Sequence, residues 1–392
     1  MVLDNDDLLR EILLRLIFPT TLVRAAAVCK RWLRHASDPA FLRRFRNLHP
    51  PRLLGLYVQT GLLGYPRFVP TPHPPAELAA AIRRAGSILD DASLGVTAVT
   101  DCRNGRVLVE LNNNKNRGDA AVLSPLHAAG GAAAVLPPLP LATRSNICTK
   151  RLTAVDGVVC AADRRWNLLS LTTRVTQGFH ELRDDGTWHN LASLKFPSGT
   201  LSTVLISRPF HGKLYLMASA SAIATLPSEF SRLHYLSIIT LPDGVECMPK
   251  GKVKPWVDDS GLYLVHVKEL QLRVWLRVME SDQWLLQDTI CLHEVCAKLG
   301  VADGLSAATA VNVREVGHCA ELVLLQLGVH VLYIHIRSRN VENVYTVKLE
   351  KPWIRLTPFV MIWPPIFPVV KEVKMALKTN NRPRFASRCL IL

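Results

Sequence analysis

The stretch that decides the fold is residues 6–45, DDLLREILLRLIFPTTLVRAAAVCKRWLRHASDPAFLRRF. Its apolar residues recur with the three- and four-residue spacing of an amphipathic helix, first at Leu8, Leu9, Ile12, Leu13 and Leu16. Two further patterns of this kind follow the interruption at Pro19: Leu22 and Val23, then Val28, Cys29, Trp32 and Leu33. After a break at Asp38-Pro39, Phe41 and Phe45 begin a last turn. The spacing predicts three or four short helices.

A module of about 40 residues buries too little apolar surface to be stable alone, so its apolar faces need a partner. That partner is either the rest of this chain or another protein.

The segment resembles an F-box, the module that docks a protein onto the Skp-type adaptor of a cullin-RING ubiquitin ligase. The resemblance rests on LLREILLRL at residues 8–16, Pro19, Leu22, the Val28-Cys29-Lys30-Arg31-Trp32 run and Asp38-Pro39-Ala40-Phe41. Family members usually carry Leu-Pro before the first acidic residues, where this chain has Asp4-Asn5. The resemblance implies ten adaptor-binding residues: Leu8, Leu9, Ile12, Leu13, Leu16, Pro19, Leu22, Val28, Cys29 and Trp32.

The composition is that of a folded chain with reduced thiols. Of the 392 residues, 49% are apolar and 20% are charged, which allows a sizeable core. An acidic start without a basic-then-apolar leader, and the lack of an 18-residue apolar run, favour neither secretion nor a membrane span. The nine cysteines form no CxxC pair, and there is no glycosylation sequon. We therefore expect the protein in the cytoplasm or the nucleus.

The net charge of +15 lies mostly at the two ends of the chain. Residues 1–52 carry a net charge of +5 and residues 351–392 a net charge of +7, which leaves +3 for the middle. A nucleic-acid-binding domain would collect positive charge on one folded face. We therefore expect no specific nucleic-acid partner.

The pattern of residues changes after the helical stretch. Plant F-box proteins of one large family continue with a Pro-Pro and Leu-Leu-Gly run similar to residues 50–58 of this chain. Residues 66–75 contain five prolines, which predicts coil or a linker. From about residue 86, short apolar runs alternate with turns, and Asn104-Gly105 between two such runs predicts a β-hairpin.

Two spacings indicate a repeat of about 50 residues. Glycines that each precede an apolar strand stand at Gly157, Gly212 and Gly261, with a looser one at Gly328. Trp188 and Trp284 each follow a polar turn and lie 96 residues apart, close to twice the repeat. Such repeats are typical of kelch-type propeller blades. An irregular β-sandwich with coincidental spacings is the alternative, and the family resemblance also favours a propeller-like domain.

The predicted fold class is therefore mainly β with a small α N-terminal module: a three-helix F-box followed by a β-propeller-like, kelch-type domain. We place the F-box at residues 1–48, a Pro-rich connector at 49–85, the β-propeller-like domain at 86–370 and a basic tail at 371–392. Within the β domain only residues 290–305 have a helical pattern, with Gly300 as a candidate C-cap.

Enzyme signatures are missing from the sequence. It has no GxGxxG, GxxxxGK[ST], HExxH or GxSxG motif and no paired cysteines for zinc, and the His293-Glu294-Val295-Cys296 group does not converge on a helix. We therefore expect no catalytic residue, cofactor or metal.

The C-terminal Cys389-Leu390-Ile391-Leu392 fits the prenylation pattern, with basic residues upstream. A membrane contact is expected only if Cys389 is prenylated.

By resemblance, the chain is expected to be the substrate-recognition subunit of an SCF-type ubiquitin ligase. Its F-box would bind the Skp-type adaptor, and through it a cullin, while the β domain recruits a target protein that the sequence does not identify. The alternative is an F-box-like interaction scaffold that no longer joins a ligase.

Overall fold

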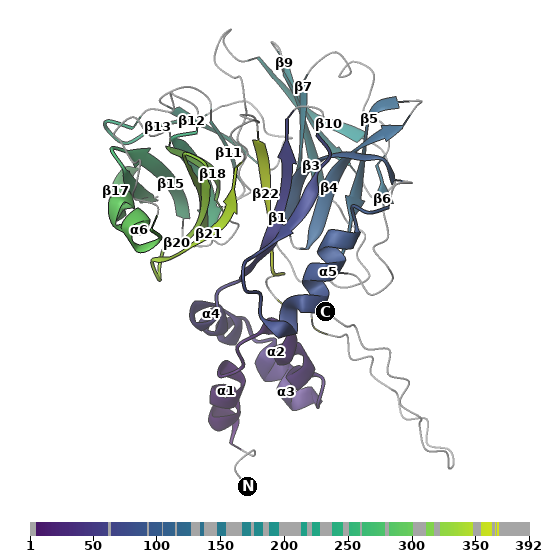
Figure 1. The fold of residues 1–392 in the computed structure, drawn as a ribbon, viewed down its shortest axis with the longest axis vertical. Coiled ribbons are helices and arrows are strands. Elements are labelled where there is room, and N and C mark those ends of the chain that lie inside the picture. Colours follow the sequence, from purple (N-terminus) through teal and green to yellow (C-terminus); the bar gives the residue numbers. More distant parts are fainter. Residues whose placement is uncertain are drawn as a thin grey trace.

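The computed structural model describes residues 5–61, 64–91, 94–103, 105–113, 116–126, 134–136, 147–153, 167–173, 176–182, 188–195, 213–217, 222–227, 237–245, 251–258, 261–278, 282–300, 311–316, 322–347, 354–362, 365 and 367. A small helical module lies below a larger β domain (Figure 1). The module contains four short helices: α1 (Asp6–Leu14), α2 (Pro19–Ala26), α3 (Lys30–Ala36) and α4 (Pro39–Leu48). The predicted mainly β chain with a small α N-terminal module is confirmed.

The β domain consists of antiparallel sheets, six of them in the described part of the chain, which we number as blades 1 to 6. Blade 1 contains β1 (Leu53–Thr60), β2 (Arg67–Pro70) and β22 (Ile354–Val360). Blade 2 contains β3 (Val96–Arg103), β4 (Arg106–Asn113), β5 (Asn116–Leu123) and β6 (Ala134–Val135). Blade 3 contains β7 (Ile147–Thr153), β8 (Asn167–Thr173), β9 (Thr176–Leu182) and β10 (Trp188–Lys195).

Blade 4 contains β11 (Lys213–Met217), β12 (Ala222–Pro227) and β13 (Ser237–Thr240). Blade 5 contains β14 (Val253–Asp258), β15 (Gly261–Lys268), β16 (Gln271–Val278) and β17 (Gln283–Cys291). Blade 6 contains β18 (Val311–Val316), β19 (Leu322–Leu327), β20 (His330–His335) and β21 (Asn340–Thr346). Within the described ranges, the helices of this domain are the 3-10 turn η2 (Ala76–Leu78), α5 (Ala79–Ser87) and α6 (Leu292–Lys298).

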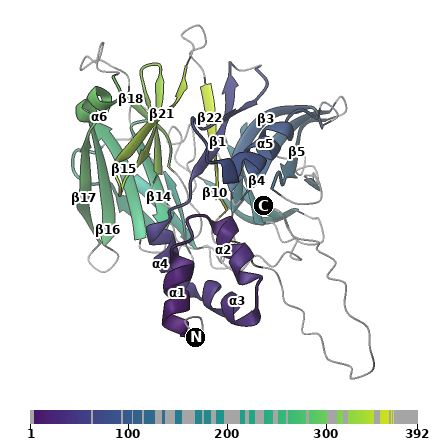
Figure 2. The same ribbon diagram turned by 60° about the horizontal axis from the view of Figure 1, so that its bottom comes forward.

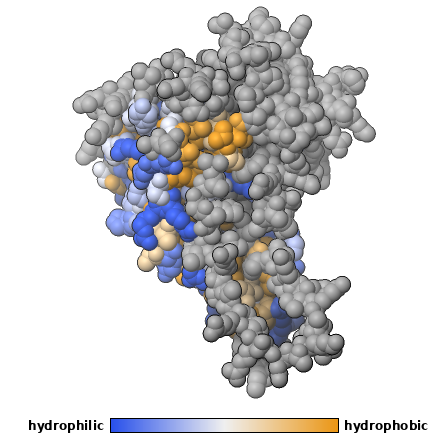
Figure 3. Space-filling model, turned by 90° about the vertical axis from the view of Figure 1, so that its right-hand side faces the viewer, coloured by the Kyte–Doolittle hydropathy of each residue, from blue (hydrophilic) through white to orange (hydrophobic). Residues whose placement is uncertain are grey.

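The sheets are arranged as propeller blades, because apolar side chains pack between successive sheets. One cluster joins blades 1 and 2 with α5, another joins blades 4 and 5, another joins blades 5 and 6 with α6, and another joins blades 6 and 1. Along the inner edge, β22 contacts both β3 and β18, while β3 contacts β7 and β18 contacts β14. In the side view of Figure 3, an apolar area shows on the upper, broader part of the molecule, and a smaller one shows lower down.

The domain closes by pairing its first strand with its last. β1 pairs with β22 from Leu53↔Val360 to Thr60↔Ile354, with a bulge between Leu53 and Gly55. The bulge shifts the alternation of β1, so that Leu54 and Tyr57 face blade 2 while Leu56 faces blade 6. A Cβ at Gly55 would lie 2.5 Å from the Val69 carbonyl oxygen of β2, which explains the glycine at this position.

Several local predictions are confirmed. β3 and β4 form the predicted hairpin, and Gly105 has a φ of 70° in its turn. α6 ends at Lys298, and Gly300 has the left-handed conformation of a helix C-terminus. Trp188 and Trp284 both lie at the start of an outer strand, β10 and β17.

Two predictions need correction. The Pro-rich connector at 49–85 is not only coil, because β1 and β2 within it belong to blade 1. β2 tolerates the prolines since it pairs only with β1, as an edge strand, and has Pro70 as its last residue. The glycine spacing also does not follow the blades, because Gly261 begins the second strand of blade 5 while Gly328 precedes the third strand of blade 6. Gly157 and Gly212 lie outside the described residues.

No helix in the described ranges combines the length and the apolar character needed to cross a membrane.

His266 on β15 provides a test of the fold by pH. It is 4% exposed, and its pKa is lowered from 6.5 to about 4 by burial first and then by Arg273, Lys268 and Lys252. Between these two pH values the unfolded chain binds the proton and the folded chain does not, so stability falls as the pH drops from 6.5 towards 4.

We expect His266→Gln to remove most of this loss, about 3 kcal/mol at most. Urea unfolding at pH 7, 5.5 and 4.5 measures it, with the exposed His293→Gln as the control. If stability fell with pH as much in His266→Gln as in the wild type, the burial of a neutral imidazole would be contradicted.

Candidate functional site

The first helix of the module begins at an asparagine cap. The Asn5 side-chain oxygen accepts hydrogen bonds from the backbone N–H groups of Asp7 at 2.9 Å and Leu8 at 3.3 Å. Two of the free N–H groups of α1 are thereby paired. Of the two residues that depart from the family pattern, Asn5 therefore has a structural role as the cap of α1. Asp4 lies outside the described residues.

Polar side chains fix α1 against α3. The Asp6 carboxylate accepts hydrogen bonds from Arg31 Nε at 2.7 Å and from the buried His35 Nε2 at 3.1 Å. His35 Nδ1 in turn accepts a hydrogen bond from Arg10 Nε at 3.2 Å, which fits a neutral imidazole protonated on Nε2. Hydrogen bonding from Arg31 is the main cause that lowers the pKa of Asp6. The first turn of α1 therefore lies beside α3.

The other helix ends are also held. Asp38 accepts a hydrogen bond from the Phe41 N–H at 2.8 Å and so caps α4, with Pro39 at the first helical position. His49, just after α4, donates from Nε2 to the Leu14 carbonyl oxygen at the end of α1, at 2.7 Å. The Asp38-Pro39 break in the sequence is therefore the start of a helix that returns to α1.

The module has its own small core. Its fully enclosed apolar side chains come from all four helices: Leu9, Leu13, Leu14, Leu22, Ala26, Ala36, Phe41 and Phe45. Three of the ten predicted adaptor-binding residues, Leu9, Leu13 and Leu22, belong to this core and are 0% exposed. Pro19 is buried as well, at the first position of α2. In this structure Leu9, Leu13 and Leu22 hold the module together, whereas Pro19 lies outside this core.

The remaining six predicted residues reach the surface to different degrees. Leu8 is 38% exposed, Val28 is 67% exposed, and Cys29 is exposed as a free thiol. Ile12, Leu16 and Trp32 are partly buried, and Leu16 and Trp32 pack against the core from its rim. Val28 and Cys29 precede α3 rather than lying in it, because α3 begins at Lys30. The exposed apolar residues of the predicted set therefore lie in the first turn of α1 and in the loop before α3.

Two residues that the sequence did not single out are Ile17 and Phe18, which differ in their surroundings. Ile17 is 52% exposed, whereas the Phe18 ring packs against the apolar cluster between blades 1 and 2. The guanidinium carbon of Arg52 lies 5.1 Å from the centre of the Phe18 ring. Phe18 is the N-cap residue of α2, and no local pattern predicts its packing because its neighbours in the cluster come from distant parts of the sequence.

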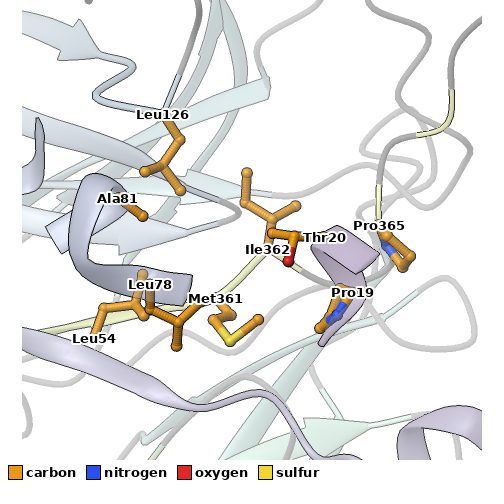
Figure 4. Close-up of a pocket in the computed structure, with 9 residues that line it drawn as sticks. All are labelled: Pro19, Thr20, Leu54, Leu78, Ala81, Leu126, Met361, Ile362 and Pro365. Carbon is orange, nitrogen blue, oxygen red and sulfur yellow. The ribbon is translucent and has the colours of Figure 1, made fainter. Parts of the chain in front are cut away.

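The junction between the module and the propeller is apolar and short. Four residues separate the end of α4 from β1, and the Arg52 carbonyl accepts a hydrogen bond from the Met361 N–H at 3.0 Å. A small pocket here has a cavity volume of about 40 Å³. Its lining comes from α2, β1, η2, α5, the turn after β5 and the segment after β22, as Figure 4 shows: Pro19, Thr20, Leu54, Leu78, Ala81, Leu126, Met361, Ile362 and Pro365. This volume suits one water-sized group, so the pocket is a packing gap of the junction.

Two further contacts cross the junction. Phe367 packs against the core of the helical module, so the chain returns to the module after β22. Arg337, in the turn between β20 and β21, donates to the Asn47 side chain of α4 at 3.3 Å. The helical module is therefore held by blade 1, by blade 6 and by the segment after β22.

Two other candidates from the sequence are the His293-Cys296 group and the C-terminal cysteine. His293, Glu294 and Cys296 lie on α6 as predicted, with Cys296 buried among apolar neighbours. In the described part of the chain, no group of His, Cys, Asp and Glu side chains could hold a metal ion. Cys389 and the basic tail lie outside the described residues, so the prenylation site stays a prediction.

These features define a class of protein, namely an F-box module fixed to a β-propeller. Residues 6–48 match the family model described as F-box-like, and residues 98–367 match the one described as "F-box protein AT5G49610-like, beta-propeller". The second match covers more than half of the chain, so the chain belongs to the family of F-box proteins with this AT5G49610-like β-propeller.

Similarity to other known proteins is low. No curated protein sequence matches the chain. Solved structures that resemble it include TolB from Acinetobacter baumannii, with 10% identity over 72% of this chain and 62% of that chain at a TM-score of 0.37. Sqt1 from Saccharomyces cerevisiae matches with 10% identity over 64% of each chain at a TM-score of 0.33. This chain covers less than two thirds of the length of TolB and of Sqt1.

Asn5→Ala should destabilise the helical module by about 1 kcal/mol, because two N–H groups of α1 lose their acceptor. Hydrogen exchange of the α1 amides measures the change. Asn5→Asp keeps a side-chain acceptor and should exchange like the wild type. Equal exchange in Asn5→Ala and the wild type would contradict the cap.

Phe18→Ala should loosen the module from the propeller and cost about 2 kcal/mol, roughly half the loss at a fully buried phenylalanine. Scanning calorimetry should then show the module unfolding before the propeller. Ile17→Ala, at the neighbouring exposed side chain, is the matched control and should leave the transition unchanged. A single unshifted transition in Phe18→Ala would contradict the coupling.

Proposed function

We propose that this protein is the substrate-recognition subunit of an SCF-type ubiquitin ligase. Its F-box would bind the Skp-type adaptor and through it a cullin, and its propeller would recruit a target protein for ubiquitin transfer by other subunits. The observation that carries the proposal is an F-box with a complete core of its own that still exposes Leu8 and Val28. Exposed apolar side chains gathered on a small module are typical of a protein-binding surface.

The adaptor-contacting residues are proposed to be the six of the predicted ten that reach the surface: Leu8, Ile12, Leu16, Val28, Cys29 and Trp32. Trp32, half-buried beside the core, would form the centre, because aromatic residues dominate binding energy at interface centres. The exposed Arg24, Lys30 and Arg34 flank this area and would favour an acidic partner surface. The four buried residues would act indirectly, by keeping the helices in place.

The role would be non-catalytic, because recruiting a target needs no reactive group in this chain. The proposed location is the cytoplasm or the nucleus, with membrane contact only if Cys389 is prenylated. The alternative is an F-box-like scaffold outside any ligase, suggested by Asp4-Asn5 in place of Leu-Pro. Affinity for the adaptor separates the two functions.

The double variant Leu8→Ala, Val28→Asp should weaken binding to a purified Skp-type adaptor by about tenfold or more, because it removes two exposed apolar contacts and places a charge in the interface. Surface plasmon resonance measures the affinity, and circular dichroism checks that the variant folds. Leu285→Asp, at a similarly exposed leucine on β17, is the control and should bind normally. Undiminished binding of the double variant would rule out this surface, and no binding by the wild type would favour the scaffold.

A further inference from the structure

One end of blade 5 carries a group of cations on a single face of the sheet. His266 on β15 lies directly opposite Arg273 on β16, and Lys268 lies opposite Gln271. Opposed residues of an antiparallel pair share a face, and so do residues two apart on one strand. His266, Lys268, Arg273 and Gln271 therefore form one polar group at the end of the sheet.

This face is turned towards blade 4. Val253, which lies opposite His266 on β14, belongs to the cluster packed between blades 4 and 5. A Cβ built at Gly244, in the turn after β13, would lie 4.0 Å from the Lys268 ammonium nitrogen. The polar group is therefore bordered by the turn after β13.

The polar group lies at the end of the propeller away from the F-box. In blade 6, the turn between the third and fourth strands contacts α4 through Arg337. In an antiparallel meander, the turn between the second and third strands lies at the opposite end, and in blade 5 this turn is Glu269–Leu270. The Leu270 carbonyl accepts a hydrogen bond from the Leu292 N–H at the start of α6 at 2.8 Å. In Figure 2, α6 lies at the upper left of the propeller and the F-box helices lie at the bottom.

The positive charge of the group is not neutralised by the described residues around it. Arg273 donates to the neutral Gln271 side-chain oxygen, from Nε at 3.2 Å and from Nη2 at 2.8 Å. With the described residues, Lys252 and Lys268 form no ion pair, and neither do Glu269 and Asp243 in the adjoining turns. Elsewhere in the same blade, cations do have carboxylate partners: Lys254 lies 3.3 Å from Glu315, and Arg277 lies 2.7 Å from Asp282.

The buried imidazole of His266 lies among these cations. Its Nδ1 atom has no hydrogen-bond partner among the residues that the structure describes, and the residue is 4% exposed. A buried polar atom without a partner is costly, so a bound group that pairs with the imidazole is favoured. Burial, then Arg273, Lys268 and Lys252, lower its pKa to about 4, so all three cations act on this side chain.

We propose that His266, Lys268 and Arg273, with Lys252 beside them, form a binding site for an oxyanion, either a phosphate or a carboxylate group. A guanidinium and two ammonium groups supply the charge-assisted hydrogen bonds that such groups prefer. On the proposed function, this site would receive a phosphorylated or acidic segment of the target protein, at the face left free when the F-box binds its adaptor.

The test uses the full-length protein and inorganic phosphate, with sodium acetate as the carboxylate probe and sodium chloride to keep the ionic strength constant. Isothermal titration at pH 7 should detect phosphate or acetate binding to the wild type, and the stronger of the two identifies the oxyanion. Nuclear magnetic resonance should show His266 shifting with the added anion, because the anion favours its protonated form.

Lys268→Ala and Arg273→Ala should each weaken anion binding by about tenfold, and the double variant should show none. Arg83→Ala with Lys213→Ala, at exposed cations outside this site, is the matched control and should bind like the wild type. The double variant should still bind the Skp-type adaptor, which separates failure of this site from failure of the proposed function. Wild-type binding of neither anion above chloride, or full binding by the double variant, would overturn the proposal.

Discussion

The antiparallel pairing of β1 with β22 is the constraint on which the rest of the structure depends. The two strands lie about 300 residues apart in the chain, and their hydrogen bonds join the first and last blades. β1 comes directly after the F-box, and the chain after β22 returns to it through Phe367. One strand pair therefore closes the propeller and also positions the helical module. The bulge at Gly55 supports both roles, because it lets β1 contribute apolar side chains to the clusters on either side.

Much of this architecture could be predicted from the sequence, because local patterns specify it. Helical spacing predicted the F-box helices, Asn104-Gly105 predicted the hairpin, and the two tryptophans marked equivalent outer strands. The glycine spacing failed as a measure of the blades because a glycine that precedes a strand recurs at different positions within a blade. β2 was missed because proline content says nothing about whether a strand is an edge strand. Neither question can be answered without the pairing of distant segments.

Only part of the candidate site could likewise be predicted from the sequence. The amphipathic arc of α1 includes both Leu8 and Leu9, yet only packing against α3 and α4 decides that Leu9 is enclosed and Leu8 is exposed. Phe18 was missed because its contact is with a propeller cluster whose members are far away in sequence. The cations around His266 were likewise invisible, since they come together only through the register of β14, β15 and β16. Residue type was readable from the sequence, whereas exposure and neighbours required the fold.

The junction determines how far the opposite face of the propeller lies from the F-box helices. His49 joins the end of α4 to α1, and Arg52, Met361 and Phe367 connect the helical module with the first strand and the returning chain. The far face then lies roughly one strand length beyond the junction, about 26 Å for the eight residues of β1. A protein held there would be presented at a nearly constant distance and angle from whatever binds the helices. Which of its surface groups came within range would then depend on its own shape rather than on motion within this chain.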